Sequence, residues 1–191
     1  MQSVAEMPFV AAHPALDFVN TAEERGHPQA ADALLSPADL SYWGSRYGLV
    51  TDSTATGPNA AAEFARAVEA RELLYSLFLA NASGRPFPTG ALERLGDLAS
   101  DAYRAGSLER DSDGSVNWHW TRSALATIRH VAVTSGLELL QAEPSPRLKQ
   151  CPGDHCGWFF LDNTKRGNRR WCSMSECGQE EKNRRRRSTT A

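Results

Sequence analysis

The chain has 191 residues, of which 41% are hydrophobic, which is enough for one globular domain with a small appendage and excludes wholesale disorder. No apolar run approaches the roughly 20 residues of a membrane-spanning helix. The first ten residues lack the basic start and long apolar stretch of a secretion signal, so we expect a cytoplasmic protein without membrane association.

The formal net charge of −2 conceals two segments of opposite sign. Residues 1–146 contain 10 arginines, no lysine and 18 acidic residues, a net charge of −8. Residues 147–191 contain 11 basic and 5 acidic residues, a net charge of +6. This division predicts two parts with those bounds, and the basic part suits a polyanionic partner.

Helical signals dominate the first third of the chain. Pro14 and the apolar spacing after it predict a helix that the turn at 26–28 ends. Ser36, Pro37 and Asp39 form an N-cap, a first-turn proline and a capping box, which predict a second helix that stops at Gly48. A polar loop over 51–59 should follow.

The next elements are two helices, a hairpin and another helix. Apolar residues at helical spacing predict a long helix over 59–81 and a shorter one that begins at Thr89 and runs to about residue 104. Alternating residues around an Asp113–Gly114 turn predict a β-hairpin over 107–120. Helical spacing returns over 121–142, and the prolines in 143–147 mark a domain boundary. We expect a mainly α fold with one small β-hairpin (α+β), followed by a small zinc-finger module with four cysteine ligands.

All four cysteines lie in the basic segment, as Cys151-x4-Cys156 and Cys172-x4-Cys177. Two close pairs joined by a short excursion are typical of a tetrahedral structural zinc site. A module of about 30 residues cannot bury enough apolar surface to fold alone, so it needs a metal or disulfides. Four cysteines leave no open coordination position, so we expect structural Zn²⁺.

Other interpretations of the four cysteines stay open at this point. Two disulfides would require an exported protein, a redox pair normally has two intervening residues, and an iron–sulfur cluster also accepts four cysteines. His155 is adjacent to Cys156 and could replace it as a ligand.

The basic residues of this segment are candidates for contact with phosphates. They are Lys165, Arg166, Arg169, Arg170, Arg184, Arg185, Arg186 and Arg187. A metal-pinned loop would present guanidinium groups without an ordering cost on binding. We expect nucleic acid as the partner, with DNA ahead of RNA, although the spacing itself does not distinguish them. No recognition-helix pattern is evident, and Trp158 and Trp171 should pack on the zinc core rather than stack on bases.

The segment from Cys151 to Gly178 resembles the CGNR zinc finger. The resemblance rests on the His155-Cys156-Gly157-Trp158 run, on Phe160 and Asp162, and on the step from Arg169 through Cys172 to Met174. The closing tetrapeptide departs from the family pattern, because Gln179 and Glu180 stand where Asn and Arg are expected.

The first part is similar to the ABATE domain, the usual N-terminal companion of this finger. The similarity lies in residues 13–21 and 34–43. The resemblance implies a zinc-binding, bacterial-type transcription regulator of the stress response, with no ligand or target named.

An enzyme is not expected, because no nucleophile–base set, phosphate-binding glycine loop or HExxH motif is present. One side of the first predicted helix carries four polar residues, Asp17, Asn20, Thr21 and Arg25. They are candidates for an effector pocket, and a second possibility is a catalytic pocket. The alternative is that Asn20 and Thr21 brace backbone while Asp17 pairs with an arginine.

We therefore predict a transcription regulator whose zinc finger binds nucleic acid and whose N-terminal domain serves for sensing or dimerisation. A homodimer and a small-molecule effector are partners consistent with this role. The competing hypothesis is a protein-interaction module whose basic finger docks on an acidic protein surface, including the protein's own N-terminal domain.

Overall fold

The computed structural model describes residues 3–25, 28, 30–51, 57–122, 124–142 and 147–189. The predicted turn at 26–28, most of the polar loop at 51–59 and the proline-rich boundary at 143–146 lie wholly or partly outside these ranges. None of the helices in the described ranges carries an apolar stretch long enough to cross a bilayer.

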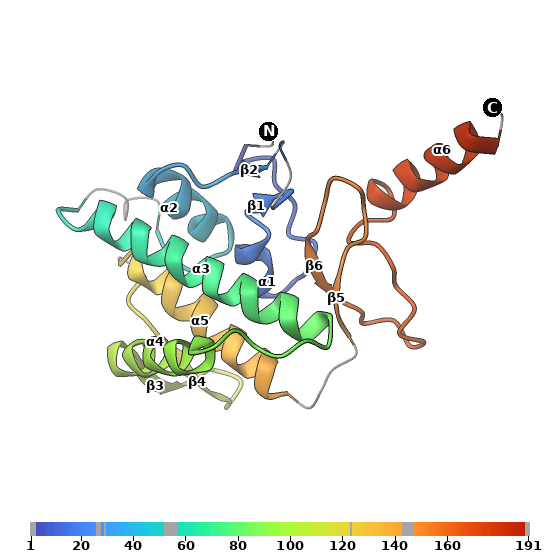
Figure 1. Ribbon diagram of the computed structural model, residues 1–191. Helices are drawn as coiled ribbons and strands as arrows, with labels where there is room; N and C mark the ends of the chain where they lie inside the picture. Colours follow the sequence, from blue (N-terminus) through green and yellow to red (C-terminus); the bar gives the residue numbers. More distant parts are fainter. Residues whose placement is uncertain are drawn as a thin grey trace.

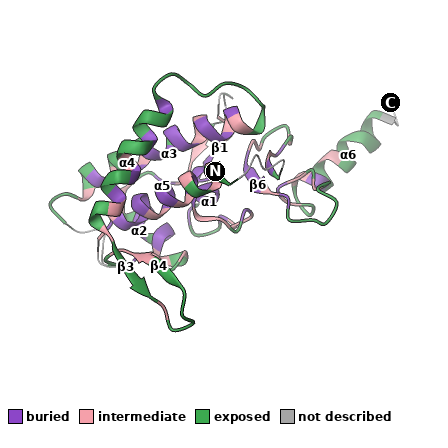
Figure 2. Cartoon of the chain, turned by 90° about the horizontal axis from the view of Figure 1, so that it is seen from below, coloured by how far each residue is buried: buried purple, intermediate pink, exposed green. Residues whose placement is uncertain are grey.

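Within the described ranges, five helices build the N-terminal part and a sixth ends the chain (Figure 1). They are α1 (Pro14–Val19), α2 (Pro37–Arg46), α3 (Ala60–Ala82), α4 (Ala91–Ala105), α5 (Ala126–Gln141) and α6 (Cys177–Thr189). Helix α5 packs against α1, α3 and α4, and the buried residues concentrate where these helices meet (Figure 2). Gly136 permits the close approach of α5 to α3, because a Cβ there would lie 2.6 Å from a methyl group of Leu74.

Each strand pairs with one antiparallel neighbour in a two-stranded sheet. The pairs are β1 (Ala22–Glu23) with β2 (Ala31–Asp32), β3 (Ser107–Arg110) with β4 (Val116–His119), and β5 (Leu148–Gln150) with β6 (Phe159–Leu161). The β3–β4 hairpin is exposed along most of its length (Figure 2). The β5–β6 pair belongs to residues 147–189, which we call the finger, and it lies against the N-terminal helices (Figure 1).

The expected fold class is confirmed, and several local signals act as predicted. Ser36 Oγ accepts the N–H of Asp39 at 3.3 Å, and the Asp39 carboxylate accepts the N–H of Leu35 at 3.0 Å. Gly48 follows the end of α2 with φ +76°. The long helix and the hairpin with Gly114 in its turn also form as expected.

Three helix boundaries and one further helix differ from the prediction. Helix α1 ends at Val19, because the chain turns at Asn20 into strand β1. Thr89 does not cap α4; Gly90 occupies the N-cap position with φ +73°. Helix α5 begins only at Ala126. In its first turn the Thr127 hydroxyl donates to the carbonyl of Thr121, which precedes the helix. The sequence pattern predicts no helix for the basic end of the chain, which forms α6.

Candidate metal centre

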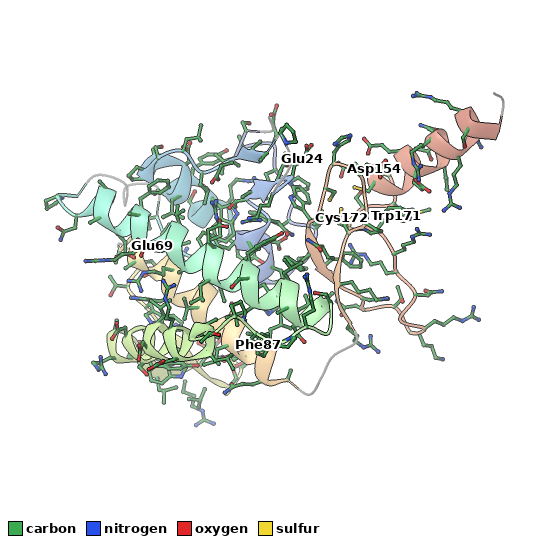
Figure 3. All side chains as sticks on the ribbon, in the orientation of Figure 1. Glu24, Glu69, Phe87, Asp154, Trp171 and Cys172 are labelled. Carbon is green, nitrogen blue, oxygen red and sulfur yellow. The ribbon has the colours of Figure 1, made fainter. Side chains whose placement is uncertain are left out.

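The sulfur atoms of the four cysteines converge from three stretches of chain. Cys151 follows β5, Cys156 ends the turn that leads back to β6, Cys172 follows the long excursion, and Cys177 begins α6. Their sulfur atoms all lie within 4.8 Å of one another. Figure 3 shows Cys172 and Trp171 inside the finger, at the base of α6. The predicted convergence of the two pairs is therefore present.

The sulfur separations fit a tetrahedral zinc ion. The Sγ atoms of Cys156 and Cys172 are 3.5 Å apart, and those of Cys172 and Cys177 are 3.6 Å apart. Four thiolates at a Zn–S distance of about 2.3 Å place the sulfurs about 3.8 Å from one another. All four cysteines are free thiols, and the donor set leaves no coordination position for a substrate. The site thus suits a structural zinc ion.

Two glycines shape the turn that carries the first two cysteines and leads back to β6. A Cβ on Gly153 would lie 3.2 Å from the Cys177 sulfur, so a side chain there would press on the site. Gly157 has φ +72°, a conformation that glycine adopts at little cost. The N–H of Cys151 donates to the carbonyl of Trp158 at 2.7 Å, which closes the turn and returns the chain along β6.

Without a cation the four thiols cannot all be ionised. Hydrogen bonding to the Cys151 sulfur raises the pKa of Cys156 and of Cys172, because a thiol beside a thiolate retains its proton. A divalent ion reverses this effect, since it deprotonates the thiols that coordinate it. Metal binding therefore releases protons and weakens as the pH falls.

His155 is not one of the converging ligands. Its side chain is 59% exposed, and its Nδ1 lies 3.6 Å from a carboxylate oxygen of Glu24. Trp158, in contrast, is buried beside Cys151 and Phe160, as expected for a tryptophan that packs on the metal centre.

The side-chain amide of Asn20 in the N-terminal domain pairs with the backbone of the finger, much as a neighbouring strand would. Asn20 Nδ2 donates to the carbonyl of Phe159 at 2.9 Å, and the N–H of Phe159 donates back to Asn20 Oδ1 at 2.8 Å. The Phe159 ring is fully buried in the core of the N-terminal domain, edge-on to Tyr75 and Phe78. Phe159 thus joins the hydrophobic core of the helices, together with Leu148 of the same finger.

Arg169, one of the predicted phosphate contacts, is used inside the protein. Its guanidinium donates to the carbonyls of Leu161, Trp171 and Cys172, and to that of Val10 from the N-terminal part. It also lies 4.5 Å from the centre of the Phe160 ring. Sequence reasoning missed this role, because nothing in the pattern distinguishes Arg169 from its exposed neighbours.

The other seven predicted contact residues are exposed. Lys165, Arg166 and Arg170 lie on the basic loop, which we define as residues 163–170, and the remaining four lie on α6 (184–187). The side chains of both segments extend away from the N-terminal helices (Figure 3). The contact between the finger and the N-terminal domain therefore leaves these seven residues accessible to solvent.

Asp162 organises the basic loop from inside. One carboxylate oxygen accepts the N–H and the hydroxyl of Thr164, and the other accepts Lys149 Nζ and the N–H of Arg169 at 2.7 Å each. Burial opposes the charged form, but these hydrogen bonds outweigh it and hold the pKa of Asp162 below its ordinary value. The network therefore persists at neutral pH and is lost as acid protonates the carboxylate.

We expect Asp162→Ala to loosen the basic loop while the zinc site stays loaded. Backbone amides of 163–170 should exchange with solvent at least about tenfold faster, because the local opening no longer breaks charge-assisted hydrogen bonds. Hydrogen exchange read by mass spectrometry, with zinc content measured on the same sample, checks this. Asp154→Ala, at an exposed aspartate of the finger, is the matched control; equal exchange in the two variants would contradict the assignment.

The residues grouped as an effector pocket do not share a helix face, because α1 ends before Thr21 and Arg25. Asp17 is buried and accepts backbone N–H groups at the start of α1, and Thr21 donates to the carbonyl of Phe18. Arg25 pairs with Glu72, with nitrogen–oxygen distances of 3.1 Å. The side chains of Asp17, Asn20 and Thr21 thus bond backbone groups of the protein.

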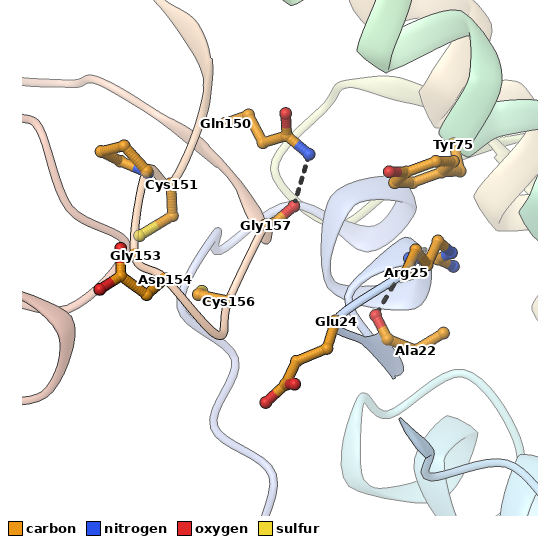
Figure 4. A pocket seen from close by; sticks show the side chains of 11 residues that line it. Ala22, Glu24, Arg25, Tyr75, Gln150, Cys151, Gly153, Asp154, Cys156 and Gly157 are labelled. Carbon is orange, nitrogen blue, oxygen red and sulfur yellow. Dashed lines mark hydrogen bonds between the residues drawn. The ribbon is translucent and has the colours of Figure 1, made fainter. Parts of the chain in front are cut away.

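Arg25 also lines a cavity of about 270 Å³ between the N-terminal domain and the finger (Figure 4). Its guanidinium lies 4.2 Å from the centre of the Tyr75 ring. The opposite wall is the segment from Gln150 to Gly157, which includes the turn that carries Cys151 and Cys156.

Two family models match stretches of the chain. A model of the ABATE family, described as "putative stress-induced transcription regulator", matches residues 12–149, and a model of the CGNR zinc finger matches residues 147–189. No curated protein matches the chain. Both families are described as regulatory or zinc-binding, and neither as enzymatic. The chain belongs to the ABATE family, with a CGNR zinc finger as its C-terminal part.

Proposed function

We propose that the protein is a zinc-dependent transcription regulator that binds nucleic acid through the finger. The observation that carries the proposal is the exposure of seven of the eight predicted basic contact residues on the basic loop and α6, away from the acidic domain. Guanidinium groups held on a metal-pinned scaffold suit phosphate oxygens. The zinc ion would shape this surface and take no part in chemistry.

In this proposal the N-terminal domain serves for sensing or dimerisation and holds the finger in one orientation. A small-molecule effector would occupy the cavity beside Arg25, where it would touch the turn that carries two of the cysteines. A homodimer would present two fingers to one duplex. Division of the chain into units at 1–146 and 147–191 is part of the same proposal, although Phe159 ties the two units together.

Binding is expected to depend steeply on salt. If six of the exposed basic side chains each neutralise a phosphate, log K should fall with log salt at a slope of about −5 on duplex DNA. Replacing Lys165, Arg166 and Arg170 by alanine should make the slope shallower by about 3 units. Fluorescence anisotropy titrations of labelled duplex DNA and structured RNA at four salt concentrations give these slopes.

The matched control replaces Arg85, Arg94 and Arg104 of the N-terminal domain by alanine. These three arginines are exposed, so the change in net charge is identical and only the position differs. A slope equal to that of the unmodified protein supports the proposal. Retention of neither nucleic acid at low salt would overturn it and favour the protein-interaction module.

A further inference from the structure

Helix α6 extends from the metal centre into solvent (Figure 1). Its thirteen residues span about 20 Å, and the side chains from Lys182 to Ser188 are all exposed. The helix carries five basic and two acidic side chains and is exposed along its outer turns (Figure 2). An isolated helix of this length is marginal in water, so its anchor is the first turn, where Cys177 is one of the converging sulfurs.

One side of α6 is occupied by ion pairs within the finger. Glu181 accepts Arg184 Nε at 2.8 Å and Arg185 Nε at 2.6 Å. Arg184 also lies 3.6 Å from the Asp154 carboxylate. These contacts orient the two arginines along the flank of the helix.

A second side of α6 carries a different set of side chains. Gln179, Lys182, Asn183 and Arg186 recur at i, i+3, i+4 and i+7, which places them on one face. All four are exposed. Gln179 Nε2 donates to Asn183 Oδ1 at 3.0 Å, so the two amides are held together. We call this set the amide face.

The chemistry of the amide face matches the edges of base pairs. Glutamine and asparagine side chains pair with N6 and N7 of adenine, and lysine and arginine pair with O6 and N7 of guanine. The major groove of B-form DNA admits an α-helix, whereas the major groove of A-form RNA is too deep and narrow for side chains to read. Lys182 and Arg186, four residues apart, repel each other in water, and a polyanionic groove removes that penalty.

We propose that the amide face enters the major groove of duplex DNA and reads base edges, while Arg184, Arg185 and the basic loop contact the flanking phosphates. This inference rests on the proposed nucleic-acid function and makes it specific. The finger is then a reader of DNA sequence rather than a general phosphate clamp.

The test uses the full-length, zinc-loaded protein and a pool of randomised duplex DNA. Rounds of selection should enrich a short motif. Asn183→Ala should weaken binding to the selected duplex by roughly tenfold, with little effect on a scrambled duplex, because only base contacts are lost. Ser188→Ala, on the same helix outside the amide face, should leave both affinities unchanged. Alanine favours helix more than asparagine, so circular dichroism should show α6 retained.

The outcomes separate the two proposals. Binding to duplex DNA without an enriched motif, equal losses on both duplexes for Asn183→Ala, or equal affinity for duplex RNA would overturn the groove assignment and leave nucleic-acid binding standing. Failure to retain any nucleic acid at low salt would overturn both. An enriched motif whose discrimination falls only with the amide face supports the inference.

Discussion

Removing zinc with a chelator is expected to unfold the finger and to destabilise the helices of the N-terminal domain as well. Structural zinc contributes about 10–16 kcal/mol to the folding of small zinc modules. The buried cluster at the metal centre consists of two of the ligands, Cys151 and Cys172, with Trp158 and Phe160 of the finger and Met7 of the N-terminal part. Little of this cluster remains without the ion. Helix α6 should melt, and Phe159 should no longer be held in the helical core.

Circular dichroism, recorded during thermal melting with and without chelator, measures this effect. On addition of chelator the helical circular dichroism signal should fall by the amount that α6 contributes. The thermal transition of the remaining helices should then move to lower temperature. Cys172→Ser should reproduce the loss, whereas Ser175→Ala, at an exposed residue between the last two cysteines, should not. An unchanged melting curve after complete metal removal would contradict the role of zinc in the fold.

Phe159→Ala is expected to destabilise the helical domain although the residue belongs to the finger. Truncating a fully buried phenylalanine costs about 3–5 kcal/mol, a large share of the roughly 5–15 kcal/mol that stabilises a typical domain. The midpoint of the helical transition should fall by about 10 °C. Phe87→Ala, at a phenylalanine that is 38% exposed, should shift it much less.

Asn20→Ala tests the same contact from the other side. The substitution leaves the buried N–H and C=O groups of Phe159 without their partner, at about 1–3 kcal/mol for each group. Thermal melting of both variants with zinc bound should show one cooperative transition at lower temperature. Two separate transitions, with the helical one unmoved by Phe159→Ala, would show that the finger and the domain fold independently.

Elements whose signals are local could be predicted from the sequence. The capping box of Ser36 and Asp39, the Asp113–Gly114 turn and the apolar spacing of α3 each act within a few residues. The cysteine spacing predicted the metal centre for a similar reason, since each pair bends around the ion within a single turn.

Contacts between distant parts of the chain could not be predicted in this way. Asn20 and Phe159 are 139 residues apart, and neither has a local pattern that indicates the other. Asn20 also ends α1, and its side-chain amide pairs with the backbone of Phe159 in β6. Arg169 was missed because nothing local marks it as different from its exposed neighbours, and one of its four carbonyl partners, Val10, lies far away in the sequence.

Helix α6 was missed because its stability depends on an anchor rather than on apolar periodicity. Its outer turns have no hydrophobic face, which is the main signal for a helix in a sequence. The signals that remain are Glu180 in the first turn, Arg186 and Arg187 in the last, and Glu181 at helical spacing from its arginines. The family's asparagine and arginine are replaced by Gln179 and Glu180, and an acidic residue suits the positive end of the helix dipole.

We expect the four cysteines to hold one zinc ion and thereby to shape the basic surface. Elemental analysis combined with zinc X-ray absorption, on protein purified without added metal, tests it most directly. We expect one zinc ion per chain, surrounded by four sulfurs at about 2.3 Å. Protein that folds with substoichiometric metal, or an ion with nitrogen or oxygen ligands in place of sulfur, would contradict it.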